Sequence, residues 1–219
     1  MSLAAQTTAA YDHFHEGGAP ELTDVAAHIR TVNADFQASY DPSTAIQVGD
    51  ALPEFHLTDV TGKKVSSTEL LSHGPLLITF YRGEWCPFCN LAFAAMQKHL
   101  DEFKAKGVAL VAITPELPDT SLSTIEKHQL KFPVLSDVGN DFAKKLGILF
   151  QQPDSMRPVF KTMGFDLATR NGDDSFVLPI PATLLVDQKG VVRNTFIDPE
   201  FSRRLEPSTA LEWIDALQK

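Results

Sequence analysis

Cysteine is scarce in this chain: its 219 residues include only two, at positions 86 and 89. A secreted scaffold held together by several disulfides needs more cysteines, so that class of protein is excluded. No apolar run approaches the ~18 residues of a membrane-spanning helix. The N-terminus, MSLAAQTTAAYDHF, has neither the basic start nor the apolar core of a secretion signal. We therefore expect a soluble, cytoplasmic protein.

Basic residues are also fewer than acidic residues. The chain has 19 lysines and arginines against 28 aspartates and glutamates, which gives a formal net charge of −9. This balance argues against a nucleic-acid partner and against binding to an anionic membrane surface. Internal repeats and low-complexity tracts are absent. Hydrophobic residues make up 43% of the chain, which is ordinary for a globular protein and enough for a sizeable core.

Residues 1–45 are predicted to form a helical N-terminal extension. An alanine-rich stretch runs from Leu3 to Phe14, and a second stretch opens at Pro20-Glu21. Apolar residues in the second stretch recur every three or four positions, so they share one face of a helix. We expect this face to pack against the main domain or against a second subunit. It consists of Leu22, Val25, Ile29, Val32 and Phe36.

Residues 46–219 alternate between short apolar strands and helices. This alternation predicts one α/β domain with a mixed central sheet flanked by helices. A polar stretch at about 150–178 is expected to be an irregular insertion that shapes a substrate entrance or a dimer contact. Strands are expected at 55–60, 64–66, 76–81, 108–114, 132–135, 182–186 and 191–197, and helices at 67–71, 90–106, 121–128, 137–146 and 207–217.

Both cysteines lie in FYRGEWCPFCN, residues 80–90, directly after an apolar run. A strand is expected to end near Arg82, and a helix to begin near Pro87 or Cys89. Cys86 and Cys89 would then share one face of the first helical turn, ~5–6 Å apart, which suits a disulfide. The positive end of the helix and the charge of Arg82 favour thiolates, the form that attacks disulfides and peroxides.

The cysteine pair allows other interpretations. The two residues could be inert members of a core. Zinc would need two further ligands, and the nearest histidines, His73 and His99, form no recognisable pairing with the motif. We therefore expect no metal and no other cofactor. Trp85 is expected to pack over the site, and Glu84 to be a solvated acid or, as the weaker alternative, a proton acceptor.

Trp85-Cys86-Pro87-Phe88-Cys89 resembles the W-C-x-x-C motif of thioredoxin-fold oxidoreductases. Residues 180–187, IPATLLVD, resemble the proline-containing strand that faces the dithiol in that fold. The resemblance implies a thioredoxin-like fold in which Pro181 forms a cis peptide bond beside the cysteines. It also implies that Trp85, Pro181 and Thr183 contact the substrate.

The whole domain, roughly residues 47–217, is similar to peroxiredoxins of the alkyl hydroperoxide reductase/thiol-specific antioxidant (AhpC/TSA) family. The chain resembles in particular a branch that carries Y-R-G-x-W-C-P-x-C-N and a late R-x-E-P, here Arg204–Pro207. The matching segments occur in the family's order. They are VGDALPEF (48–55), FY (80–81), VALVAITP (108–115), FPVLSD (132–137) and VDQKGVVR (186–193).

The two resemblances assign the attacking sulfur differently. Thioredoxins imply that Cys86, as the exposed first cysteine, attacks and that Cys89 resolves. Peroxiredoxins, aligned on Phe80-Tyr81, imply that Cys89 attacks and that Cys86 resolves. The arginine that binds peroxide in most peroxiredoxins has no match, so Arg82 is the candidate substitute. The buried acid that thioredoxins place before their first cysteine is replaced by Phe80.

The resemblances imply a thiol-dependent peroxide reductase with Cys86, Cys89 and Arg82 as catalytic residues. A thiolate would attack the O–O bond, a Cys86–Cys89 disulfide would follow, and a dithiol donor such as thioredoxin would reopen it. One alternative is a thiol–disulfide oxidoreductase that acts on protein disulfides. Another is a non-catalytic metal-binding or redox-sensing module. A homodimer is compatible with the apolar face of the N-terminal extension.

Overall fold

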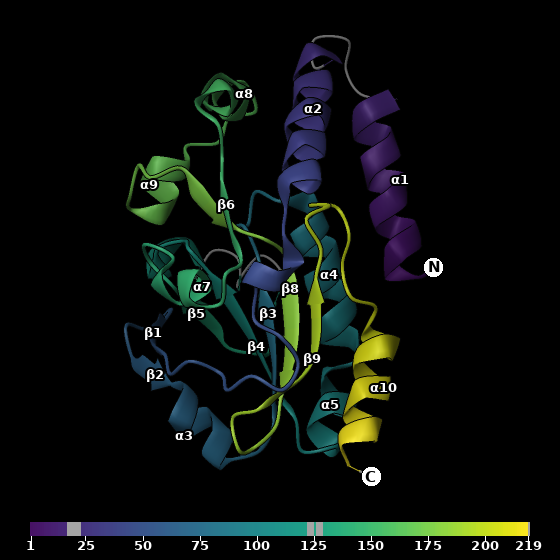
Figure 1. The fold of residues 1–219 in the computed structure, drawn as a ribbon, viewed down its shortest axis with the longest axis vertical. Helices are drawn as coiled ribbons and strands as arrows, with labels where there is room; N and C mark the ends of the chain where they lie inside the picture. Colours follow the sequence, from purple (N-terminus) through teal and green to yellow (C-terminus); the bar gives the residue numbers. More distant parts are fainter. Residues whose placement is uncertain (17–22, 122–124, 126–128, 219) are drawn as a thin grey trace.

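The computed structural model describes residues 1–16, 23–121, 125 and 129–218, and its central layer is a seven-stranded sheet (Figure 1). The strands of this sheet are β1 (His56–Asp59), β2 (Lys64–Ser66), β3 (Leu76–Phe80), β4 (Ala109–Thr114), β5 (Val134–Ser136), β8 (Ala182–Val186) and β9 (Val192–Ile197). They lie in the order β2-β1-β5-β4-β3-β8-β9. β3, β4 and β5 are parallel, and the other neighbours pair antiparallel.

Helices cover both faces of this sheet, with α4, α5 and α10 on one side and α7 on the other (Figure 1). The side chains of the central strand β3 explain why both faces need cover. Successive side chains of a strand point to opposite faces, so Leu77 packs in one core and Leu76 and Ile78 in the other. The helices around the sheet are α3 (Ser67–Ser72), α4 (Pro87–Lys98), α5 (Leu100–Ala105), α7 (Asp141–Lys145) and α10 (Pro207–Leu217). This arrangement is the expected thioredoxin-like α/β fold.

Two N-terminal helices, α1 (Leu3–Glu16) and α2 (Thr23–Ser39), lie side by side beyond one end of the sheet (Figure 1). Backbone N–H groups at the start of α1 donate to the carboxylate of Glu206. On α2, Asn33 and Gln37 donate to Glu200 at 2.7 and 3.0 Å. A short 3₁₀ helix, η2 (Pro42–Thr44), follows. The predicted helices are therefore present, and hydrogen bonds join both of them to residues 200–206.

The segment 150–178 is not irregular, which corrects the sequence expectation. It contains a two-stranded sheet and three short helices, and its helices stand apart from the main sheet (Figure 1). Each element is too short for its hydrophobic period to be recognised. Local capping still defines the ends, since the side chain of Asp166 accepts from the Thr169 N–H. The elements are β6 (Leu149–Gln151), η3 (Asp154–Met156), α8 (Arg157–Thr162), α9 (Leu167–Asn171) and β7 (Val177–Pro179).

Other expected elements differ in their ends. The helix predicted at 90–106 is divided into α4 and α5 at His99. The helix predicted at 137–146 begins only at 141, because the Asp137 carboxylate accepts from the Phe142 and Ala143 N–H groups and holds the preceding turn. Most of the helix predicted at 121–128 lies outside the described residues. In the described ranges, every helix is too short or too polar to cross a membrane.

Candidate active site

The two cysteines lie together at the start of α4. Cys86 is the N-cap residue and Pro87 opens the helix, so the motif forms the strand-to-helix turn that its sequence predicts. The Sγ atoms are 2.7 Å apart, with the Cys89 thiol donating to Cys86. Both residues are free cysteines here. A disulfide requires an S–S distance of ~2.05 Å, so the sulfurs need to approach by less than about 1 Å.

Both cysteines are buried, which corrects the expectation of an exposed Cys86. Cys86 is 0% exposed and Cys89 1% exposed. They belong to the core cluster between the sheet and α4, because the turn that carries them folds inward. A reactant therefore cannot reach either sulfur across an open surface.

Arg82 lies against the first cysteine, as its position in the motif suggested. Its Nη2 donates to Cys86 Sγ at 3.4 Å. Its guanidinium carbon lies 5.0 Å from the Trp85 ring centroid and 4.8 Å from that of Phe201. The two aromatic rings restrict the guanidinium, and its charge faces the sulfur.

A second arginine, Arg204, completes the site and was missed as a site residue. Its Nη2 donates to Cys89 Sγ at 3.0 Å and lies 3.7 Å from Cys86 Sγ. Its Nη1 donates to the carbonyls of Phe201 and Arg203, which fixes its direction. The R-x-E-P motif at 204–207 was the available signal. Because this motif lies more than a hundred residues after the cysteines, local spacing could not predict the contact.

The surroundings of the two thiols give them different pKa values. Burial acts to raise the pKa of Cys86, but the hydrogen bond from Cys89 and the charges of Arg82 and Arg204 outweigh it. The pKa of Cys86 is therefore held well below its usual value. Burial and the neighbouring Cys86 sulfur raise the pKa of Cys89 well above its usual value. Of the two sulfurs, Cys86 is therefore the one that ionises first, and Cys89 keeps its proton to higher pH.

A buried ion-pair network stabilises the turn that carries the cysteines. Glu116, which is fully buried, accepts from Arg170 Nε at 2.7 Å and from the Glu84 N–H at 3.0 Å. Arg170 also pairs with the Glu84 carboxylate at 3.2 Å, so Glu84 is not the solvated acid expected from the sequence. Gly83 has a φ of +148°, and a Cβ there would meet Trp85 Nε1 and Glu116 Oε1. The network therefore fixes the path of residues 83–86.

Replacing Arg170 with methionine should destabilise the protein by about 3 kcal/mol, because it leaves the buried Glu116 carboxylate without its cation. Urea unfolding of the reduced protein measures this loss. The matched control is Arg157→Met in the same segment, where the pairs with Asp154 and Asp174 are exposed and predict a much smaller loss. Equal losses in the two variants would show that the network has no special role.

The predicted substrate-contacting residues separate into two groups. Trp85 and Pro181 line an apolar cavity that also reaches Arg82 and Pro87. Thr183 is not among the lining residues, and its hydroxyl donates to that of Thr79 on the neighbouring strand β3 at 3.4 Å. The expectation of a cis bond at Pro181 is wrong: the described residues contain no cis peptide bond. The chain passes from β7 to β8 through trans peptide bonds.

The described residues also contain no group of three or more His, Cys, Asp or Glu side chains arranged to hold a metal ion. Nearby cations are the two arginines, which cannot serve as ligands.

Comparison with known families gives a match to the sequence model described as the AhpC/TSA family, over residues 48–195. The N-terminal helices lie outside this match. The matched region includes the cysteine turn, Glu116 and Arg170, but it ends before Arg204.

The similar proteins include two kinds of oxidoreductase. The chain is 27% identical over 115 residues to "Thiol-disulfide oxidoreductase ResA" of Bacillus cereus, which is 52% of this chain and 65% of that protein. It is 30% identical over 158 residues to "Peroxiredoxin Q, chloroplastic" of Populus jackii, covering 71% of this chain and 63% of that protein. Among solved structures, Peroxidoxin BcpB of Mycobacterium tuberculosis has a TM-score of 0.62 at 20% identity, over 80% of this chain and 99% of its own.

Proposed function

The chain belongs to the AhpC/TSA family, and on that basis we propose that it is a thiol-dependent peroxide reductase that cycles through a Cys86–Cys89 disulfide. The branch that combines a W-C-P-x-C motif with a late R-x-E-P motif is part of this proposal. The observation that supports it most is the pairing of two arginines with a buried dithiol.

In the first step the Cys86 thiolate attacks the terminal oxygen of the hydroperoxide. The O–O bond breaks, Cys86 becomes a sulfenic acid, and the rest of the peroxide leaves as an alkoxide that takes a proton and becomes an alcohol. Negative charge moves from sulfur to the leaving oxygen during this step. Arg82 and Arg204, already directed at the sulfurs, can stabilise that charge as it moves.

In the second step the Cys89 sulfur attacks the sulfenic acid sulfur of Cys86. The S–O bond breaks, water leaves with the Cys89 proton, and the disulfide forms. The short distance between the sulfurs makes this step fast compared with further oxidation. A dithiol such as a thioredoxin-type protein then supplies two electrons and two protons and restores both thiols.

The alternative, a reductase of protein disulfides, has support in the similarity to thiol-disulfide oxidoreductases. The burial of both sulfurs argues against it. Because Cys86 is 0% exposed, a disulfide of a folded protein needs a much wider opening of the turn to reach the thiolate than a small hydroperoxyl group does.

The test is to measure peroxide consumption with a thioredoxin-based regenerating system and to compare it with the reduction of insulin disulfides. We expect steady peroxide turnover and little insulin reduction. Robust insulin reduction without peroxide turnover would instead establish the alternative. The dithiol reductant, a reducing compartment such as the cytoplasm, and a homodimer belong to the same proposal. Sedimentation of the reduced and the oxidised protein tests the homodimer.

A further inference from the structure

The loop between β9 and α10, residues 198–206, contacts both arginines of the site. The Phe201 carbonyl accepts from Arg204 Nη1, and the Phe201 ring centroid lies 4.8 Å from the Arg82 guanidinium carbon. The same ring packs edge-on against Phe88 of α4, with centroids 5.4 Å apart. Since Arg204 also touches both sulfurs, the position of this loop determines where positive charge lies beside the cysteines. The loop and the N-terminal helices both lie outside the family match.

Two acids of the loop bind the N-terminal helices. Glu200 accepts from Asn33 and Gln37 of α2 at 2.7 and 3.0 Å. Glu206 accepts from the first backbone N–H groups of α1, where the helix dipole is positive. Figure 1 shows the loop running beside both helices. Among the described residues Arg204 forms no ion pair with a carboxylate, so its charge is left to the sulfurs and two carbonyls.

Glu200 shares a hollow with Arg204. Both side chains line this space between α1 and the loop, together with Tyr11 and Ser202. A guanidinium can bind a carboxylate through two parallel hydrogen bonds, which add geometric specificity as well as energy. Glu200 would therefore draw Arg204 away from the sulfurs unless other donors satisfy its oxygens. In this structure the α2 amides donate to Oε2, and Ser202 donates to Oε1.

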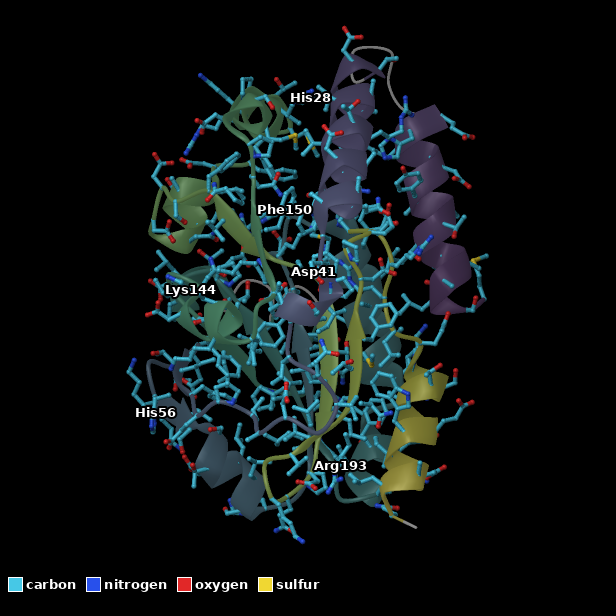
Figure 2. The ribbon with its side chains drawn as sticks, viewed as in Figure 1. His28, Asp41, His56, Lys144, Phe150 and Arg193 are labelled. Carbon is cyan, nitrogen blue, oxygen red and sulfur yellow. The ribbon has the colours of Figure 1, made fainter. Side chains whose placement is uncertain are left out.

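The helix that supplies these amides is itself held on its other side. Phe36 of α2 stacks on Phe150 of β6, with ring centroids 4.0 Å apart, and His28 bonds to Ser155 at 3.0 Å. Figure 2 labels His28 and Phe150 beside α2. Together with α1, α2 also forms a wall of the apolar cavity near the dithiol. Asn33 is only 7% exposed. The helix is therefore a fixed support for the amides that bind the loop.

We propose that Asn33 and Gln37 are positioning residues for the dithiol, because they bind the loop acid that would otherwise pair with Arg204. With Glu200 held by α2, the guanidinium stays on the two sulfurs of the reduced enzyme. The proposal rests on the proposed peroxide reductase function, in which this charge stabilises the attacking thiolate and the leaving oxygen. An N-terminal helix thus takes part in the chemistry without touching a reacting atom.

The test is the double variant Asn33→Leu/Gln37→Leu, which removes both donors and keeps the acid. Alkylation of the reduced protein by iodoacetamide is followed against pH. The midpoint should move to higher pH by about half a unit or more, since a displaced Arg204 no longer lowers the pKa of Cys86. The kcat/KM for hydrogen peroxide should fall about three- to tenfold. An unchanged midpoint would overturn the proposal.

The midpoint is chosen because a merely structural role would not move it. A looser fold changes how easily the reagent reaches the sulfur, and this alters the rate at the alkaline plateau. The midpoint instead reports the ionisation of Cys86. The other titratable or charged groups that face this sulfur are Cys89 and Arg82, and the double variant changes neither.

Two further variants complete the design. Adding Glu200→Gln to the double variant removes the competing charge and should return the midpoint and the rate toward the wild-type values. His28→Leu is the matched control, because it removes a hydrogen bond of α2 on the opposite side and should keep the wild-type midpoint. If the double variant does not fold, as judged by circular dichroism, Gln37→Leu at its exposed position takes its place. A midpoint that Glu200→Gln fails to restore, or an equal rise in His28→Leu, would contradict the proposal.

The alkylation measurement also separates this proposal from the function, because it uses no peroxide. A higher midpoint in the double variant, with no peroxide turnover in the wild type, would overturn the function and support the positioning role. Steady turnover in the wild type, with the same midpoint in both proteins, would overturn the positioning role alone.

Discussion

Cys86→Ser is expected to abolish peroxide consumption, with a loss of about 10³-fold or more, because it removes the attacking thiolate. Cys89→Ser should still react once with peroxide and hold a sulfenic acid on Cys86, since only the resolving sulfur is missing. The reason is the difference in acidity: the arginines and the Cys89 thiol lower the pKa of Cys86, while the pKa of Cys89 is raised. We therefore expect Cys86 to supply the nucleophile.

A sulfenic-acid trap followed by mass spectrometry distinguishes the two sulfurs. The wild type treated with peroxide should give a Cys86–Cys89 disulfide, and Cys89→Ser should give an adduct at Cys86. An adduct at Cys89 in the Cys86→Ser variant, with none at Cys86 in Cys89→Ser, would reverse the assignment. It would also favour the alignment in which the peroxidatic position falls on Cys89.

Arg204→Met is expected to slow peroxide reduction about 10–100-fold at neutral pH, because it removes a cation that touches both sulfurs. The charge of Arg204 lowers the pKa of Cys86, so its loss should raise that pKa. The matched control is Arg203→Met. Arg203 is the neighbouring residue, its side chain is 68% exposed, and it pairs with Asp198 instead of a sulfur. That variant should keep the wild-type rate.

The pH dependence of alkylation by iodoacetamide measures this effect directly. In the wild type the thiolate of Cys86 persists below the usual thiol range, and reactivity should fall only as the pH drops through its lowered pKa. In Arg204→Met the fall should occur at higher pH. Identical profiles for the wild type and Arg204→Met would show that Arg204 does not act on the sulfur.

Local patterns were enough to predict the sheet and most of its helices. β3 is a continuous apolar run because helices cover both of its faces, and α4 begins at Pro87 because proline suits a first helical turn. The segment 150–178 was not predicted, since its five-residue and six-residue helices carry no visible period. Its order comes from contacts such as Arg170 with Glu116 and Arg157 with Asp174.

The sequence by itself determined the fold and the identity of the dithiol, because a strand, a turn and a helix start are properties of neighbouring residues. It also placed Arg82 beside Cys86, four positions away. Only the tertiary structure decided that Arg204 reaches the sulfurs, that Thr183 does not line the cavity, and that two N-terminal helices form a wall of the cavity. These facts depend on where distant segments meet, which is set by the packing of the whole core.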